Sequence, residues 1–378
     1  MRTVKWGEYR LEDLFEIVGT KSLDSNAVMF EKEGINFVGR TFENNGIQGK
    51  IKKRNFEPNE PYTITATVIG NYKYVKYQKE PYYCSQNINK LIPKETITKW
   101  NERIAYYFIT NIQKFVSLYD NQQGGYKLED IKHHKIYLPL INGNIYFDFM
   151  ESFIAELEAE RVAELSAYLK VSGFDNYELS NEEMEALNRF DELKDDDWGT
   201  YVVGNLFEKV KTNKLPYKAK ELPKQPIDDY VLPCLTSSFQ NQGLNYYAPK
   251  TGATVISNVI SLPSNSDVYR AYYQSNDFTV LSDSYAIRWN LSEIKLMPNQ
   301  YLFMVMCINK VTDLPIYSYK NKLGGWNVVK DKEIRVPVKD GRIDFGLMEN
   351  FISAMKKLAI KDVVLYADKK ISATKSVV

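Results

Sequence analysis

Cysteine and histidine are scarce in this 378-residue chain, and their scarcity argues against several kinds of site. The three cysteines, Cys84, Cys234 and Cys307, form no CxxC pair, so neither a disulfide framework nor a zinc site is expected. The only two histidines, His133 and His134, are adjacent and cannot supply a metal site with several histidine ligands. We expect one of them to be packed and the other to be exposed.

Long apolar segments are missing as well. One of the longest, YLFMVMCI at 301–308, is too short to span a bilayer. The first ten residues, MRTVKWGEYR, contain no apolar core of the kind that a signal peptide needs. We therefore expect a protein without membrane spans in a reducing, cytoplasmic location.

Motifs for catalysis and nucleotide binding are also lacking. The sequence has no GxGxxG fingerprint, no nucleophile elbow and no Asn-Pro-Pro-Tyr motif of the kind found in amino-methyltransferases. The segment Gly46–Lys50 has only two residues between its glycines and no Ser or Thr after the lysine, so it fails the P-loop pattern. A hydrolytic pair among the scattered carboxylates remains an alternative that one sequence does not decide.

Charge becomes informative when the chain is divided. The net charge is +1 overall, yet residues 1–147 carry 21 Lys and Arg against 16 Asp and Glu, and residues 198–344 carry 18 against 13. Residues 148–197 carry only 4 basic against 16 acidic side chains. Two basic segments suggest a polyanion as partner, although ordinary surface charge is the simpler interpretation.

An internal duplication is present and brackets two long segments. WGEYRLEDLFEIV at 6–18 recurs as WGTYVVGNLFEKV at 198–210, with seven identities in thirteen positions. INGNIYFDFMESFIAEL at 141–157 recurs as KDGRIDFGLMENFISAM at 339–355. Repeats of this length indicate two copies of one structural unit.

Shorter motifs inside the two copies also correspond. Phe42, Asn44 and Gly46 recur as Phe239, Asn241 and Gly243, in a polar turn after an expected strand. Gly124-Gly125 and Gly324-Gly325 correspond and are each followed by an aromatic residue. A paired-glycine turn either lets the backbone approach a ligand closely or is a tight turn with the ring packed inside.

The pattern predicts strands across 62–92 and 253–290, helices over 97–116 and 298–311, and a long apolar-striped helix at the end of each copy. The first long helix covers 148–170, and the second follows Phe345. We expect the two long helices to pack together, antiparallel if a pseudo-two-fold axis relates the copies. Between the copies, the acidic residues 180–197 are expected to form a solvated helix and linker rather than a metal site.

These motifs resemble the specificity subunits of type I restriction–modification enzymes. The resemblance rests on the WGxYxxxxLFE openings, the GRTFENNG turn at 39–46, the QGGYKLEDIKxxKIYLP run at 123–139 and the helix starts at Phe147 and Phe345. It covers essentially the whole chain and extends to the DNA-recognition subunits of type IIB systems of the BcgI type. The long helices are short for a type I subunit, which favours the type IIB or a compact form.

The resemblance implies an α+β protein with two pseudo-symmetric α/β target-recognition domains, each followed by a long helix. The expected boundaries are 1–147 for the first domain, 148–197 for a helical spacer and linker, 198–344 for the second domain and 345–378 for the C-terminal helix. It also implies a non-catalytic subunit that reads a bipartite double-stranded DNA target, with one half-site for each domain. A helix of about 24 residues is about 36 Å long, close to one turn of B-DNA.

Catalysis, S-adenosylmethionine and Mg²⁺ are accordingly expected on partner subunits, a methyltransferase and possibly a restriction subunit, with no cofactor in this chain. From turn position and side-chain chemistry, the DNA-binding residues expected in the first domain are Arg40, Thr41, Asn44, Lys73, Gln122, Gln123, Tyr126 and Lys127. Those expected in the second domain are Thr236, Ser238, Gln240, Asn241, Arg270, Lys320, Asn321, Lys322 and Trp326. The helix residues expected to bind partners are Met150, Phe153, Leu157, Met348, Phe351 and Met355.

Two other function classes remain open from the sequence. One is a stand-alone nuclease with an unrecognised catalytic motif, which would cleave DNA with Mg²⁺ and no partner. The other is a protein-interaction module that uses the tyrosine-rich sheets on proteins; a steep loss of DNA affinity with added salt would argue against it.

Overall fold

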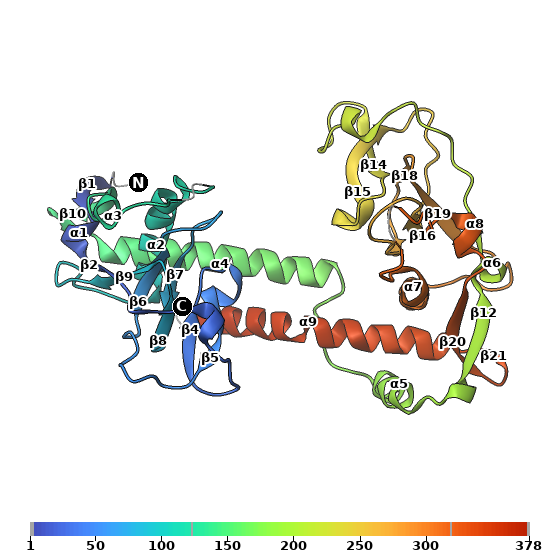
Figure 1. Ribbon diagram of the computed structural model, residues 1–378, viewed down its shortest axis with the longest axis horizontal. Coiled ribbons are helices and arrows are strands. Elements are labelled where there is room, and N and C mark those ends of the chain that lie inside the picture. Colours follow the sequence, from blue (N-terminus) through green and yellow to red (C-terminus); the bar gives the residue numbers. More distant parts are fainter. Residues whose placement is uncertain (1–3, 122–123, 318–319, 376–378) are drawn as a thin grey trace. The chain divides into compact units, whose positions relative to one another are not determined.

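The computed structural model describes residues 4–121, 124–317 and 320–375. The chain divides into two compact units. Unit 1 comprises Met1–Ala167 with Lys369–Val378, and unit 2 comprises Tyr168–Asp368. Each unit combines sheets with helices, so the α+β prediction is confirmed (Figure 1).

The described residues of unit 1 form three small sheets. Their strands are β1 (Lys5–Arg10), β2 (Phe15–Gly19), β3 (Ser22–Leu23), β4 (Ile35–Val38), β5 (Ile47–Ile51), β6 (Thr63–Thr67), β7 (Val75–Gln78), β8 (Tyr82–Ser85), β9 (Ile88–Pro93), β10 (Lys135–Ile141) and β11 (Asn144–Ile145). The sheet orders are β1-β10-β11, β2-β9-β6-β7 and β3-β8-β4-β5. The helical segments are α1 (Leu11–Leu14), η1 (Ser25–Ala27), η2 (Glu43–Gly46), α2 (Glu102–Ser117), α3 (Leu128–Lys132) and α4 (Phe147–Val171).

Unit 2 repeats this plan. Its strands are β12 (Trp198–Val202), β13 (Phe207–Lys209), β14 (Tyr230–Leu235), β15 (Leu244–Pro249), β16 (Val259–Pro263), β17 (Tyr272–Gln274), β18 (Thr279–Val280), β19 (Ser284–Trp289), β20 (Glu333–Lys339) and β21 (Arg342–Ile343). The sheet orders are β12-β20-β21, β13-β19-β16-β17 and β15-β14-β18. Its helical segments are α5 (Asn181–Glu192), η3 (Asp195–Asp197), α6 (Val203–Leu206), η4 (Ala219–Glu221), η5 (Gln240–Gly243), α7 (Pro298–Thr312), α8 (Trp326–Val329) and α9 (Phe345–Lys375).

The repeated motifs close each unit in the same way. β1 pairs antiparallel with β10, which places Trp6 opposite Pro139, and β12 pairs with β20, which places Trp198 opposite Pro337. Strands from the start and end of each copy therefore meet in one sheet. This pairing explains why the sequence repeats lie at the ends of the copies.

Each unit has its own main core, built between one amphipathic helix and the sheet β2-β9-β6-β7 in unit 1 or β13-β19-β16-β17 in unit 2. α2 packs on β6 and β7, and α7 packs on β16 and β17. Ile104, Phe108 and Ile112 of α2 are fully buried, at the i, i+4 spacing that places side chains on one helix face. Asn101 starts α2 by accepting a hydrogen bond from the Ile104 amide at 3.0 Å.

Both long helices are present and begin at equivalent residues, α4 at Phe147 and α9 at Phe345. The expected domain boundaries and the antiparallel packing of these helices stay predictions. The acidic helix between the copies is partly as expected, because most residues of α5 are exposed while one face is packed. α5 packs against α9 of its own unit, where Glu183 and Ala186 are buried.

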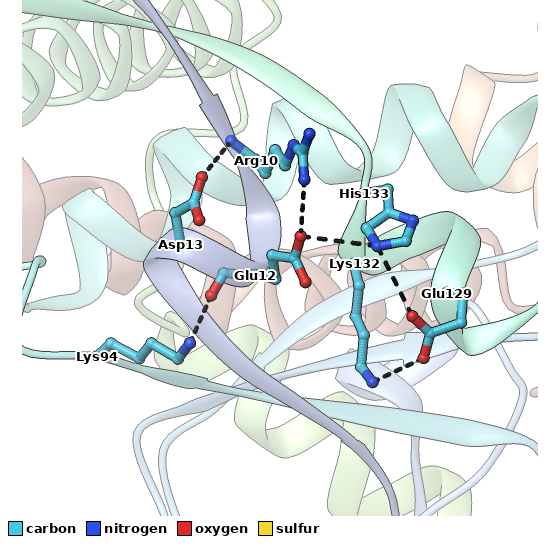
Figure 2. Close-up of polar contacts among 7 residues, drawn as sticks. All are labelled: Arg10, Glu12, Asp13, Lys94, Glu129, Lys132 and His133. Carbon is cyan, nitrogen blue, oxygen red and sulfur yellow. Dashed lines mark hydrogen bonds and ion pairs between the residues drawn. The ribbon is translucent and has the colours of Figure 1, made fainter.

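The two histidines stand at the junction of α1 and α3 in unit 1. His133 is exposed and lies 3.7 Å from the Glu12 carboxylate and 3.8 Å from that of Glu129 (Figure 2). His134 packs its ring on Phe115 at a centroid distance of 4.5 Å, and burial lowers the pKa of its imidazole. The expectation of one packed and one exposed histidine is confirmed.

The opening motif makes further polar contacts at this junction, within itself and with Lys94. Arg10 donates to Glu12, and the Lys94 ammonium donates to the Glu12 backbone carbonyl at 2.5 Å (Figure 2). Asp13 accepts from the Arg10 amide at 3.2 Å and caps α1. These contacts are mostly exposed, so we expect them to orient the segments rather than to stabilise them strongly.

Candidate nucleic-acid interface

A turn between β4 and β5 presents polar side chains from unit 1. Asn44 and Asn45 both adopt left-handed backbone angles, with φ of 45° and 54°, and Gly46 follows at 81°. Asparagine tolerates this conformation better than most residues because its short side-chain amide can form hydrogen bonds with the nearby backbone. The side-chain amide of Asn44 donates to the Ile47 carbonyl at 3.0 Å, and the backbone amide of Gly39 donates to the Gly46 carbonyl at 2.8 Å. The turn is therefore fixed from within.

Unit 2 contains the same turn between β14 and β15. Asn241 and Gln242 have φ of 45° and 54°, and Gly243 has 87°. The Thr236 amide donates to the Gly243 carbonyl at 2.9 Å. A Cβ on Gly243 would lie 2.7 Å from the Leu235 side chain and 3.0 Å from the Thr236 carbonyl oxygen, so glycine is required there.

A buried glutamine donates a hydrogen bond to the backbone of each turn. Neither glutamine was singled out from the sequence. Gln78 donates to the Asn45 carbonyl at 3.3 Å and to the Thr65 hydroxyl at 3.1 Å. Gln274 donates to the Gln242 carbonyl at 3.2 Å and to the Ser261 hydroxyl at 3.0 Å. Their exposed fractions are 2% and 5%. The recurrence of Tyr-Gln at 77–78 and 273–274 was the available signal.

Each turn also carries an exposed phenylalanine. Phe42 is 68% exposed and Phe239 is 53% exposed. The Lys76 ammonium donates to the Phe42 carbonyl at 3.2 Å and lies 4.4 Å from the centre of the ring. Burial lowers the pKa of this ammonium. In unit 2 the Tyr272 hydroxyl takes the corresponding position and donates to the Phe239 carbonyl at 3.2 Å.

The turn of unit 2 borders a groove of about 840 Å³. Four of the sequence-predicted residues line it together, namely Thr236, Ser238, Gln240 and Asn241. Gln240 and Asn241 are exposed. Thr236 is only 9% exposed, and its hydroxyl donates a hydrogen bond to the Gly243 carbonyl at 3.1 Å. The Ser238 hydroxyl accepts from the Gln240 amide at 3.1 Å. The Asn241 side-chain amide donates to the Leu244 carbonyl at 2.5 Å. Gln240 and the side-chain oxygen of Asn241 therefore remain for a ligand, whereas Thr236 supports the turn.

Lys224 and Gln225 from the preceding loop, together with Asp267 from the β16–β17 connection, complete the groove wall. Amide, carboxylate and ammonium groups around one concave surface match the donor and acceptor pattern of base edges and phosphates.

In unit 1, Arg40 and Asn44 are exposed and Thr41 is partly buried, all three on the turn. Lys127 is exposed at the N-terminal cap of α3. Gln122 and Gln123 lie outside the described residues.

Two predictions for unit 1 are wrong because the side chains are interior. Lys73 is 1% exposed, and its ammonium donates to the Gly70 carbonyl at 3.0 Å and to the Tyr119 carbonyl. Tyr126 is 3% exposed and packs its ring against Phe115 at a centroid distance of 5.3 Å. Neither side chain reaches the surface, so Lys73 and Tyr126 hold the loop rather than contact a ligand.

In unit 2, Lys320, Asn321 and Lys322 are exposed. Arg270 is exposed and forms an ion pair with Asp313 at 2.8 Å. The Trp326 ring is partly buried against the core and contacts Tyr285 at a centroid distance of 6.2 Å. The prediction of Trp326 as a DNA-binding residue conflicts with this packing, because the ring covers the core.

The paired glycines serve internal packing. A Cβ on Gly125 would lie 2.0 Å from the Val68 carbonyl oxygen, and one on Gly324 would lie 1.9 Å from the Tyr269 ring. At both places the glycine backbone lies against other residues of the same unit, which leaves no room for a side chain. Of the two interpretations left open by the sequence, the tight turn with a packed ring holds.

The helix residues predicted to bind partners separate into two groups. Met150 and Met348 are 0% exposed and Phe351 is 7% exposed, because each belongs to the core of its own unit. These three are corrected to core residues. Phe153, Leu157 and Met355 are exposed by 49%, 40% and 45%.

Among the described residues, no cluster of three or more His, Cys, Asp or Glu side chains could hold a metal ion. Within the same part of the chain, no helix combines the length and apolar character needed to cross a membrane.

Comparison with known proteins agrees with this duplicated architecture. Residues 3–167 match the family model of the type I restriction modification DNA specificity domain. The specificity subunit S.BcgI of a type II restriction enzyme from Heyndrickxia coagulans is 22% identical over 368 residues, covering 94% of this chain and 96% of that protein. The chain is therefore similar to restriction–modification specificity subunits over almost its whole length.

A solved structure shares the fold of this chain. The S subunit of a type I restriction–modification system from M. genitalium aligns with a TM-score of 0.60 at 13% identity, covering 100% of this chain and 95% of that one. The resemblance expected from the sequence is confirmed for both the family and the fold.

Proposed function

We propose that this specificity subunit reads a bipartite DNA target, with each unit binding one half-site through its left-handed turn. The duplicated turn carries the proposal. Both copies have the same φ pattern, the same buried glutamine beneath them and an exposed phenylalanine beside them. A rigid turn with exposed polar and aromatic groups suits base reading, because preorganised side chains lose little entropy on binding.

The side chains around the two turns differ, which favours different half-sites. Unit 1 offers Arg40 and the side-chain oxygen of Asn44, whereas unit 2 offers Gln240 and the side-chain oxygen of Asn241. Arginine forms bidentate contacts with guanine, and asparagine or glutamine forms them with adenine. Phe42 and Phe239 add apolar contact with base edges such as the thymine methyl group.

Exposed cations supply the phosphate contacts in this proposal. Lys127 in unit 1 and Lys320 and Lys322 in unit 2 are candidates for that role, because each is exposed on its unit. Phosphate contacts fix position and salt dependence without reading sequence.

The chain supplies no catalytic group in this proposal. A methyltransferase subunit would bring S-adenosylmethionine, and a restriction activity would bring Mg²⁺. The whole complex would act in the cytoplasm, where it has access to the chromosome.

The test begins with co-purification of the chain and a methyltransferase subunit from the same genome. The complex is then titrated with duplex DNA at several salt concentrations, using a selected target and a scrambled duplex. We expect at least about a thousandfold preference for the target. Equal affinity for both duplexes would refute sequence reading, and cleavage of plasmid by the chain alone with Mg²⁺ would refute a non-catalytic subunit.

A further inference from the structure

The connection between β13 and β14 in unit 2 carries a run of exposed lysines. Residues 211–224 contain five lysines and a single acidic residue, Glu221. All five lysines are exposed. We call them the lysine segment: Lys211, Lys214, Lys218, Lys220 and Lys224. Asp228 and Asp229 come later, in the turn directly before β14.

The lysine segment is held on the body of unit 2 by residues that lie between the lysines. Leu215 and Leu222 are buried in a small apolar cluster with side chains of β14 and β15. The backbone amide of Tyr247 on β15 donates to the Pro223 carbonyl at 3.0 Å. The backbone of the connection is therefore anchored, while the lysine side chains stay at the surface.

No carboxylate neutralises the lysine segment from within its own connection. In the part of the chain that the structure describes, none of the five ammonium groups forms an ion pair. The Glu221 carboxylate instead accepts a hydrogen bond from the Lys218 backbone amide at 2.8 Å. An anchored surface with an excess of unpaired cations favours a polyanion as its partner.

The lysine segment borders the same groove as the turn of unit 2. Ala219 and Lys224 line this groove together with Gln240 and Asn241 of the turn. A duplex whose base edges reach Gln240 and Asn241 would therefore bring its sugar–phosphate backbone to the wall that carries the lysines. Lysine ammonium groups bind phosphates as point charges and carry no sequence information in doing so.

The corresponding part of unit 1, residues 20–34 between β2 and β4, has the opposite balance of charge. It contains two lysines against three acidic residues. Unit 1 has basic residues after β5 instead, but two of them are paired, Lys52 with Glu31 at 3.2 Å and Lys53 with Glu57 at 2.9 Å. The two copies therefore differ in how many unpaired cations they place beside the turn.

We propose that the lysine segment is a phosphate-binding element of unit 2, which holds the DNA backbone along the groove wall while the turn reads the bases. The choice of DNA as the polyanion rests on the function proposed above. Because the matching connection of unit 1 is acidic, the two units contribute unequally to binding. Unit 2 supplies the larger share of the salt-dependent affinity that does not depend on sequence.

The experiment measures the affinity of the complex with the methyltransferase subunit for duplex DNA at several salt concentrations, with all five lysines changed to glutamine. Each phosphate contact contributes about 0.9 to the slope of log affinity against log salt concentration, so the loss of three to five contacts should make the slope shallower by about 3–4.5. Affinity for the target and for a scrambled duplex should fall by the same factor, because phosphate contacts do not read sequence.

Two double variants with the same loss of charge form a matched comparison. Lys218→Gln with Lys224→Gln should make the slope shallower by about 1.8. Lys295→Gln with Lys339→Gln changes two exposed lysines of unit 2 that do not line the groove, and it should leave the slope nearly unchanged. Both doubles keep Leu215 and Leu222, so each should melt within a few degrees of the original chain.

Equal slopes for the two double variants overturn the inference. A changed preference between target and scrambled duplex in the five-lysine variant also overturns it, because the segment would then read bases. Loss of methyltransferase binding in that variant overturns it as well, because the polyanion would then be a protein surface. If the unaltered complex binds target and scrambled duplex equally, the proposed function fails instead, whatever the slopes are.

Discussion

Replacing Gln78 with leucine tests whether the buried glutamine beneath the turn of unit 1 is structural support for recognition. The substitution keeps roughly the same volume but removes both donors, so the Asn45 carbonyl and the Thr65 hydroxyl lose a partner. Each buried polar group left without a partner costs about 1–3 kcal/mol. The side-chain amide of Asn45 still donates a hydrogen bond to the Tyr77 carbonyl at 2.8 Å, so the turn should loosen rather than detach.

We therefore expect the free energy of unfolding to fall by about 3 kcal/mol in Gln78→Leu. For a unit of this size, that change lowers the melting temperature by roughly 6–12 °C. Calorimetry of the purified chain measures the stability. Titration with DNA measures the recognition, which should weaken at the half-site of unit 1 and not at the half-site of unit 2.

Gln48→Leu is the matched control, because Gln48 is exposed on β5, close to the same turn. Its unfolding free energy should change by no more than about 0.5 kcal/mol. Equal stability of Gln78→Leu and Gln48→Leu would refute the reasoning, since the two buried hydrogen bonds would then contribute nothing.

Three further predictions concern single side chains. Lys73→Met should destabilise unit 1 by about 1–3 kcal/mol through loss of its carbonyl partners and leave the salt dependence of DNA binding unchanged; a shallower salt slope would restore Lys73 as a phosphate contact. The hydrogen bonds from Lys357 and Ser353 that lower the pKa of Glu183 against the effect of its burial stabilise the docked α5. This stabilisation is complete above pH 4.5, the ordinary pKa of the carboxyl, and it is lost as the pH falls through the lower pKa that Glu183 has in the folded chain. The protection of α5 amides from hydrogen exchange, corrected for the intrinsic exchange rate at each pH, should therefore fall as the pH drops below about 4.5 in the original chain and depend less on pH in Glu183→Gln; identical pH profiles would contradict this assignment. Phe42→Ala and Phe239→Ala should each weaken target binding about 10-fold or more, at one half-site only, because burying an exposed phenylalanine ring is worth about 1.5–3 kcal/mol; equal losses on scrambled DNA would count against base reading.

The duplication was predictable because matching residues lie at the two ends of each copy, where β1 meets β10 and β12 meets β20. The polar turns were predictable for the same reason, since Asn44-Asn45-Gly46 is a sequence that adopts left-handed angles readily.

The errors arise where side-chain direction depends on distant contacts. Lys73 stands among alternating lysines and tyrosines, and nothing local indicates that the Gly70 and Tyr119 carbonyls enclose it. The role of Gln78 depends on Asn45, a residue 33 positions away. The docking of α5 depends on Phe351 and Lys357, more than 150 residues further along the chain. Contacts of that separation leave no periodic signal in one sequence.

Mapping of the methylated sites in DNA modified by the assembled complex tests the central claim most directly. The account requires a motif made of two different short half-sites separated by a fixed stretch of unspecified bases, lost when the chain is removed. A single contiguous motif, or a methylation pattern that persists without the chain, would contradict the assignment of one half-site to each duplicated unit.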